Sequence, residues 1–434
     1  MKKWIVLLVF VAAIWLLPLL IPLAPYVRQA EQHASDVLGV PLVIDSAKIQ
    51  LLPSPRVVAH GVHVGGGSDV SVEELSVVPE LSSIFSAQRV ISVMMDGVLV
   101  KKTALVAYDI VQSRLAGRQS DANAPVLVKQ VQIDHLDVSA LVGLPVMRAS
   151  AGLADNALQS LRLETHDRTL VADLLPQGQA QALQVKLHDF VLPGHRLKVD
   201  EGEVRASLQA KALHITQVEL RMLDGKVTGQ GELGWQSSAK ASGKFQLQGV
   251  AMRALTRTGR GPYLSGGLSG NGSLGAETAQ LGGLLDHLWV EARLEVKEGV
   301  LHGIDLVKIA KLLLKQGGQG GETAFDTLRT QLKVQGKRTQ FKQLELESGL
   351  MTAKGNVDVL DGKQLEGAVT VAVKATAGML EVPLDVGGTV DAPTVLPDKA
   401  AALGAAVGTA LMPGVGTSLG IKAGSQFKKL FGRD

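Results

Sequence analysis

The feature that most limits the fold of this chain is a two-residue alternation of apolar and polar side chains. It begins at Val40 and recurs until Val395 in short segments, most of which are separated by clusters of Pro or Gly. Such alternation is typical of β-strands that bury one face, because successive side chains of a strand point to opposite sides. The alternation and the turn signals together mark roughly 20 strands. The sequence therefore predicts a mostly β, mostly antiparallel fold.

Helical segments are few and short. The first is expected to end at Gly39, because glycine readily adopts the left-handed conformation that closes a helix. Asp96-Gly97 is expected to form the turn of a strand pair within Val90–Lys101. The five segments for which we expect helical structure are 26–38, 80–86 (one turn), 104–117, 278–287 and 304–315.

So few helices cannot cover the apolar faces of about 20 strands. Either the sheet packs as a filled sandwich or barrel, or it curls into an elongated open groove covered by a ligand with long alkyl chains. At ~4.8 Å between strands, about 20 strands would extend on the order of 95 Å. The residues expected to line the floor of such a groove are Val218, Leu220, Phe245, Leu247, Leu344, Leu346, Val369, Val371 and Val373.

The interval between Lys3 and Arg28 contains no charged residue, and its apolar stretch predicts a transmembrane helix. About 20 apolar helical residues cover the ~30 Å hydrocarbon core of a bilayer. Basic residues precede the stretch, and the positive-inside rule therefore predicts a cytoplasmic N-terminus. The rest of the chain is then expected on the other side of the membrane. A cleaved signal peptide is the alternative, but the stretch exceeds the roughly 7–15 residues of its apolar region. The residues expected inside the membrane include Trp4, Leu8, Trp15 and Leu20.

Composition excludes several kinds of chemistry. The chain has no cysteine, which rules out disulfides, thiolate metal sites and cysteine nucleophiles. Its 44 Lys and Arg nearly balance 41 Asp and Glu, so the net charge of +3 gives no electrostatic reason to expect nucleic acid as a partner. Aromatic residues make up only 3%, which disfavours sites that stack bases or sugars on rings.

Three apparent motifs have weak structural context. His60 and His63 lie at odd separation on an expected strand, so we expect them on opposite faces without a shared metal. Gly270–Gly275 matches G-x-G-x-x-G but lacks a βαβ context, and we expect a flexible turn there. Gly416–Gly420 matches G-x-S-x-G, yet no histidine follows it, because His302 is the last in the chain.

These observations predict no catalytic residue, no metal site, no cofactor and no enzymatic activity. A hydrolase whose acidic groups meet only in space remains an alternative, because sequence does not show spatial pairing.

One pattern occurs twice in the expected strands. Residues 217–220, followed by 225–233, resemble residues 343–346, followed by 349–357, with offsets of 126 and 124 residues. We interpret this echo as one strand–turn–strand unit used in two halves, with chance similarity between amphipathic strands as the alternative.

The chain divides into five regions by these patterns. They are an anchor (1–25), an N-terminal β region with short helices (26–124), a central β region (125–277), a C-terminal β region (278–397) and a tail rich in small and basic residues (398–434). The tail could lie on an anionic lipid surface or be a loosely docked terminus.

Several segments together resemble the AsmA family of bacterial envelope proteins. They are Gly39–Asp45, Leu51–Arg56 and Val57–Gly65 near the start, and Glu298–Leu306, Thr323–Phe325 and Gly349–Val359 in the second half. The resemblance covers both ends of the chain, and the middle only by its pattern of strands.

The resemblance implies a single-pass inner-membrane protein with a periplasmic β-groove, similar to the bridge-like lipid transfer proteins with repeating β-grooves. Its implied function is to carry glycerophospholipid between the inner and outer membranes and to support outer-membrane homeostasis, with an envelope protein as a possible partner at the C-terminal end. The alternative is a non-enzymatic scaffold that assembles outer-membrane proteins.

Overall fold

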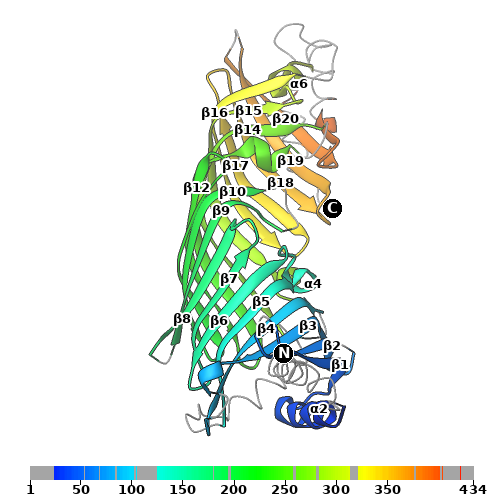
Figure 1. The fold of residues 1–434 in the computed structure, drawn as a ribbon. Coiled ribbons are helices and arrows are strands. Elements are labelled where there is room, and N and C mark those ends of the chain that lie inside the picture. The colour runs from blue at the N-terminus through cyan, green and yellow to red at the C-terminus, as the bar shows by residue number, and fades with distance from the viewer. Residues whose placement is uncertain are drawn as a thin grey trace, which may run out of the picture. The chain divides into compact units, whose positions relative to one another are not determined.

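The fold is known from a computed structural model of the chain, which is mostly β with a few short helices (Figure 1). The described residues are 24–101 and 125–400, apart from gaps at 53, 68, 84–85, 179, 194–196, 258–260, 280–282, 313–320 and 376–377, together with Ala104, Leu403 and Ile421. Nearly all of the predicted anchor and tail, and the helix expected at 104–117, lie outside these residues.

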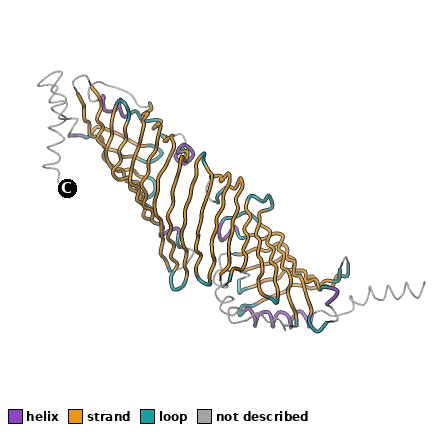
Figure 2. Tube along the Cα trace, turned by 90° about the vertical axis from the view of Figure 1, so that its left-hand side faces the viewer, coloured by secondary structure: helices purple, strands orange, loops and turns teal. Residues whose placement is uncertain are grey.

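Contacts divide the chain into two compact units, Met1–Arg196 and Leu197–Asp434. The predicted central region, 125–277, is therefore shared between them. The twenty-one described strands, close to the number expected, account for most of the trace, and helices occupy little of it (Figure 2).

The first unit begins with helix α2 (Ala24–Leu38). It ends as expected, because Gly39 has a φ of 74° and its N–H donates to the carbonyl of Ser35 at 2.8 Å. The helix also covers the free edge of the first strand. The N–H groups of Leu42 and Ile44 donate to the Ser35 hydroxyl at 2.9 Å and to the Glu31 carboxylate at 2.7 Å.

Nine strands follow in the first unit, and neighbours along the chain pair side by side. They are β1 (Leu42–Gln50), β2 (Arg56–Val64), β3 (Val70–Pro79), β4 (Arg89–Val100), β5 (Val126–Asp137), β6 (Met147–Ala154), β7 (Ala157–Thr165), β8 (Leu170–Gln177) and β9 (Ala180–Val191). The short helices are η2 (Leu81–Ser83), within the expected helical turn, and α4 (Ser139–Val142).

The expected strand pair within Val90–Lys101 is wrong. One continuous strand, β4, covers the segment, and Gly97 lies inside it with a φ of 63° instead of in a hairpin turn. β4 pairs in parallel with β5, unlike the antiparallel pairs around it. Parallel neighbours need a crossover connection, which the sequence between the two strands is long enough to supply.

Strict alternation also fails in β2. Gly61 has a φ of 64°, and Ala59 and Val62, three residues apart, both belong to one buried apolar cluster. The alternation that placed His60 and His63 on opposite faces is therefore interrupted between them. His60 lies 3.9 Å from Glu74, whereas His63 lies 3.7 Å from Asp45.

The second unit has twelve antiparallel strands paired in chain order. They are β10 (Lys198–Gln209), β11 (Ala212–Met222), β12 (Gly225–Trp235), β13 (Ala239–Ala251), β14 (Tyr263–Thr278), β15 (Trp289–His302), β16 (Glu322–Gln335), β17 (Arg338–Glu347), β18 (Met351–Leu360), β19 (Gln364–Ala375), β20 (Gly378–Gly388) and β21 (Pro393–Pro397).

Three short helices accompany these strands: α5 (Met252–Thr256), η4 (Leu285–His287) and α6 (Leu306–Leu312). The helix expected at 278–287 is wrong at its start, because Thr278 ends β14, and among the described residues of this segment Leu285–His287 form a 3-10 turn. The helix expected at 304–315 is present as α6 over its described part.

The flexible turn expected at Gly270–Gly275 is also wrong, because the segment lies inside the sixteen-residue strand β14. It pairs with β13 on one side and with β15 on the other. Glycine and serine outnumber apolar residues in this strand, which hid the alternation.

Candidate functional site

The candidate site is the apolar face of the sheet in the second unit. All nine residues predicted to line a groove lie on this face, as the register of β11–β20 shows. Side chains directly opposite each other on neighbouring strands form continuous rows across the sheet. Three of these rows describe the face.

The first row, here called the covered row, crosses eight strands and is mostly buried. It consists of Val250, Leu268, Val296, Leu328, Leu346, Ala353, Val371 and Val382. Helix α6 contributes Leu306 and Ala310 to the same cluster, and Ile421 joins it. Val371 and Val382 are 0% exposed. Protein atoms thus already fill this end of the apolar face.

Four of the nine predicted groove residues belong to this filled end. Leu346, Val369, Val371 and Val373 are all less than 9% exposed and pack in the cluster under α6. They are core residues of the cluster that includes residues of α6 and Ile421.

The other five predicted residues, Val218, Leu220, Phe245, Leu247 and Leu344, are only half-buried. Two further rows lie beyond the covered row along the strands, and their residues are also half-buried. They are here called the open rows. The first comprises Val218, Gly229, Phe245, Gly272, Ala292, Leu332, Phe341, Val357, Gly367 and Val386. The second comprises Ile215, Gly231, Gly243, Leu274, Val290, Val334, Thr339, Val359 and Leu365.

Apart from Ala292, which is buried, every member of the open rows is half-buried. Thr339 is the one polar side chain in them. The apolar side chains of these rows are therefore only partly removed from water, and apolar surface that stays accessible can mark a binding site.

Glycines in the open rows stand where a side chain would not fit. A β-carbon on Gly272 would lie 2.5 Å from the carbonyl oxygen of Glu291 and 2.7 Å from the ring of Phe245. One on Gly231 would lie 2.5 Å from the carbonyl oxygen of Ser242. Neighbouring strands therefore approach these glycines closely from the apolar side, which only glycine permits.

The opposite face of the same strands is polar. Its cross-strand pairs include Lys333 with Glu291 at 3.0 Å, and Lys354 with Glu345. The Lys354 ammonium, hydrogen-bonded to Glu345, holds the pKa of that carboxyl below its usual value.

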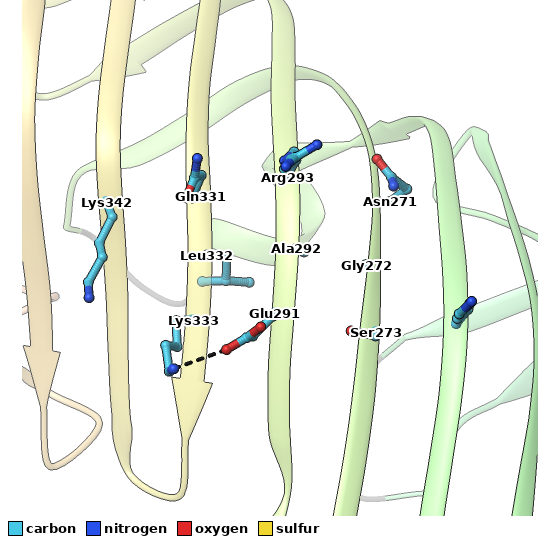
Figure 3. A pocket seen from close by; sticks show the side chains of 11 residues that line it. Asn271, Gly272, Ser273, Glu291, Ala292, Arg293, Gln331, Leu332, Lys333 and Lys342 are labelled. Carbon is cyan, nitrogen blue, oxygen red and sulfur yellow. Dashed lines mark ion pairs between the residues drawn. The ribbon is translucent and has the colours of Figure 1, made fainter.

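A shallow concavity of about 590 Å³ lies on this polar face between β13 and β17 (Figure 3). Arg293 and Lys342 lie along it on either side of Gln331, each on its own strand. These polar side chains contrast with the apolar rows of the same strands.

The repeated sequence pattern corresponds to two similar hairpins, β11–β12 and β17–β18. In each, the register shifts just before the repeated segment, between Ile215 and Val218 and between Phe341 and Leu344. In each hairpin a glutamate of the first strand forms an ion pair with a lysine of the second strand. These pairs are Glu219 with Lys226 and Glu345 with Lys354. The echo therefore falls on two hairpins whose registers differ by two residues, because Leu220 pairs with Val227 whereas Leu346 pairs with Ala353.

Sequence reasoning missed a cluster at the ends of β14, β15 and β16. The imidazole of His302 stacks on Tyr263 with ring centroids 4.2 Å apart, and its Nδ1 lies 2.7 Å from Glu322 Oε1. Its Nε2 lies 3.0 Å from the Ser265 hydroxyl. Strand register alone brings these residues together, and they are too far apart in sequence to form a motif.

Ser265, His302 and Glu322 have the hydrogen-bond order of a serine-hydrolase triad. The acid of such a triad is buried, where it orients the imidazole and stabilises its charge. The Glu322 side chain is 63% exposed, and Tyr263 covers the imidazole. This arrangement fixes the position of Tyr263 and is poorly suited to nucleophilic catalysis.

In the part of the chain that the structure describes, no group of three or more His, Asp or Glu side chains is placed to hold a metal ion. Nor does any helix among the described residues reach the length and apolar character needed to cross a bilayer. Comparisons of the chain with protein-family models, curated proteins and solved structures gave no match.

Proposed function

We propose that the protein binds glycerophospholipid, with the acyl chains lying on the open rows of the second unit. The observation that carries this proposal is the continuity of these rows over β11–β20 with a single polar side chain in them. Acyl chains need an apolar surface without directional contacts. Burying such a surface contributes about 25 cal/mol per Å².

We also propose that the strands bend toward this face and make it the floor of a groove. The close approach of neighbouring carbonyl oxygens to Gly231 and Gly272 supports the bend. Glycines at such bends are used where a sheet curls, because a larger side chain would hold the strands apart.

The proposed setting is the periplasm, with the N-terminal apolar segment anchoring the chain in the bacterial inner membrane. The resemblance to the AsmA family supports this setting and a role in moving phospholipid between the inner and outer membranes. Transport of this kind needs no covalent chemistry, because the chains slide along side chains while headgroups stay in water.

Photo-crosslinking in cells tests the proposal. A photoreactive residue would replace Leu220 or Leu332, both half-buried on the apolar face. Glu219 and Lys333, the adjacent residues on the polar face, serve as matched controls. We expect phospholipid adducts at the two leucine positions and none at the controls, as identified by mass spectrometry after extraction.

The same experiment separates the scaffold alternative. Protein adducts in place of lipid at Leu220 and Leu332 would favour an assembly factor that binds other envelope proteins. Silence at both positions would mean that this part of the apolar face carries no ligand, and the lipid proposal would be rejected.

A further inference from the structure

Helix α5 connects the apolar face to a pair of exposed arginines. Met252, its first residue, packs against the buried cluster of the second unit. The next residue, Arg253, is exposed, and Arg257 follows directly after the helix and is also exposed. An apolar contact and two positive charges therefore lie within six residues of one another.

Both guanidinium groups lie near the ring of Tyr263. The Cζ atoms of Arg253 and Arg257 are 6.0 Å and 5.4 Å from the ring centroid. Contacts of this kind attract a cation to the face of an aromatic ring and leave the N–H groups at its edge able to bind another group.

Local hydrogen bonds hold this arrangement in place. The Thr256 hydroxyl accepts from the N–H of Leu264 at 3.1 Å and lies 2.7 Å from the carbonyl oxygen of the same residue. This fastens α5 to β14. Tyr263 is held in turn by His302, which contacts Ser265 and Glu322.

The two arginines differ from most of their counterparts in the second unit. Arg221, Arg329 and Arg338 each pair with a carboxylate. Within the described residues, neither Arg253 nor Arg257 has an acidic side chain within ion-pair distance. Their N–H groups are free to bind an anion.

We propose that Arg253 and Arg257 bind the phosphate of a phospholipid whose acyl chains enter the apolar face beside Met252. This inference rests on the proposed function and adds the headgroup chemistry to it. Guanidinium groups match phosphate oxygens in geometry, and two of them form several charge-assisted hydrogen bonds. The buried Val250 lies between Met252 and Leu247 on β13, so the chains would pass beside it along Val227 and Leu247, which pack against the same cluster and are half-buried.

Binding measurements on the full-length protein test the inference. The probes are a short-chain phosphatidylglycerol, a diacylglycerol with the same chains, glycerol phosphate and inorganic phosphate. The variant is Arg253→Gln/Arg257→Gln. Arg293→Gln is the matched control, because Arg293 is also exposed but lies on the polar face of β15.

For the unmodified protein we expect phosphatidylglycerol to bind at least about tenfold tighter than diacylglycerol, because only the phospholipid offers phosphate oxygens to charge-assisted hydrogen bonds from the arginines. The double variant should lose this advantage and keep its affinity for diacylglycerol. Arg293→Gln should keep both affinities, and Arg253→Lys/Arg257→Lys should recover only part of the advantage, because lysine lacks the planar fork.

Three other results would each lead to a different conclusion. If diacylglycerol binds and the double variant keeps the preference for phosphatidylglycerol, the arginine site is wrong while the proposed function stands. If glycerol phosphate or inorganic phosphate binds as tightly as the phospholipid, the site serves a soluble phosphate and the lipid assignment is overturned. If neither lipid binds, the proposed function fails and this inference fails with it.

Discussion

The covered row and the open rows of the second unit are built from the same strands but have different environments. Around Val371 the apolar face is closed by α6 and Ile421, so its side chains are core. Around Leu332 the described part of the chain leaves the same face half-buried. The strands and the chemical type of the side chains are alike in the two regions. The difference in burial therefore comes from α6 and Ile421, which pack on one region of the face and not on the other.

The second unit therefore has both a covered part and a half-buried part on one apolar face. The covered end stabilises the sheet without a ligand. We expect the stability of the unit to depend on the covered row and not on any cover over the open rows. Three predictions test this division.

The largest expected effect is on stability at the covered end. Met351 is 2% exposed, and Met351→Ala should lower the free energy of unfolding by about 2–5 kcal/mol through lost burial and a residual cavity. Leu332→Ala in the open rows should cost only about 1 kcal/mol, because water already reaches that side chain. Urea denaturation of the full-length variants measures both. Equal losses would show that the open rows are core as well.

A smaller effect is expected where glycine permits close approach of strands. Gly272→Ala places a β-carbon 2.5 Å from the Glu291 carbonyl oxygen, so we expect a loss of about 1–3 kcal/mol from strain. If the strands bend as proposed, the substitution should also reduce lipid crosslinking at Leu332 by widening that bend. Gly349→Ala is the control, since nothing lies within 4 Å of the position that its β-carbon would take and its φ is not positive. A tolerated Gly272→Ala would contradict the close approach.

The smallest effect is expected on the polar face. Arg338 and Gln340, hydrogen-bonded to Asp358, hold the pKa of that carboxyl below 3.8. Because the folded-state pKa is lowered, the pair stabilises the fold at neutral pH, and the contribution is lost as the pH falls through the folded-state value. Asp358→Asn should therefore cost within about 1 kcal/mol at pH 7.

The pH dependence of this variant is the readout. Its difference in unfolding free energy from the unmodified protein should stay constant down to about pH 4 and shrink below it. Lipid crosslinking at Leu332 should not change, because Asp358 lies on the opposite face of the sheet. If the difference in unfolding free energy grew as the pH fell, the lowered pKa of Asp358 in the folded state would be rejected.

Much of the β structure followed from alternation. The strand containing Val369, Val371 and Val373 was predicted with its face, because period-two patterns mark both the strand and the side that is buried. The α2 helix and its end at Gly39 followed from a helical pattern and a terminating glycine. The repeated pattern was visible as an echo and falls on two hairpins, although the strands of these hairpins pair in registers that differ by two residues.

The errors share a physical cause. In β14 the glycines that let neighbouring strands approach look like turn residues when their partners are unknown. Gly97 was assigned to a hairpin for the same reason, although its positive φ lies inside β4. A glycine indicates permissive backbone, and the neighbouring strands decide whether it forms a turn, a bulge or a close contact.

The sequence by itself determined that the chain is mostly β and which side chains share the apolar face, because both depend on local alternation along each strand. Only the tertiary structure decided which part of that face is covered, since α6 packs on strands distant from it in sequence. It also brought Arg253, Arg257, Tyr263 and His302 together. Such groupings depend on strand register and helix docking, which no local pattern encodes.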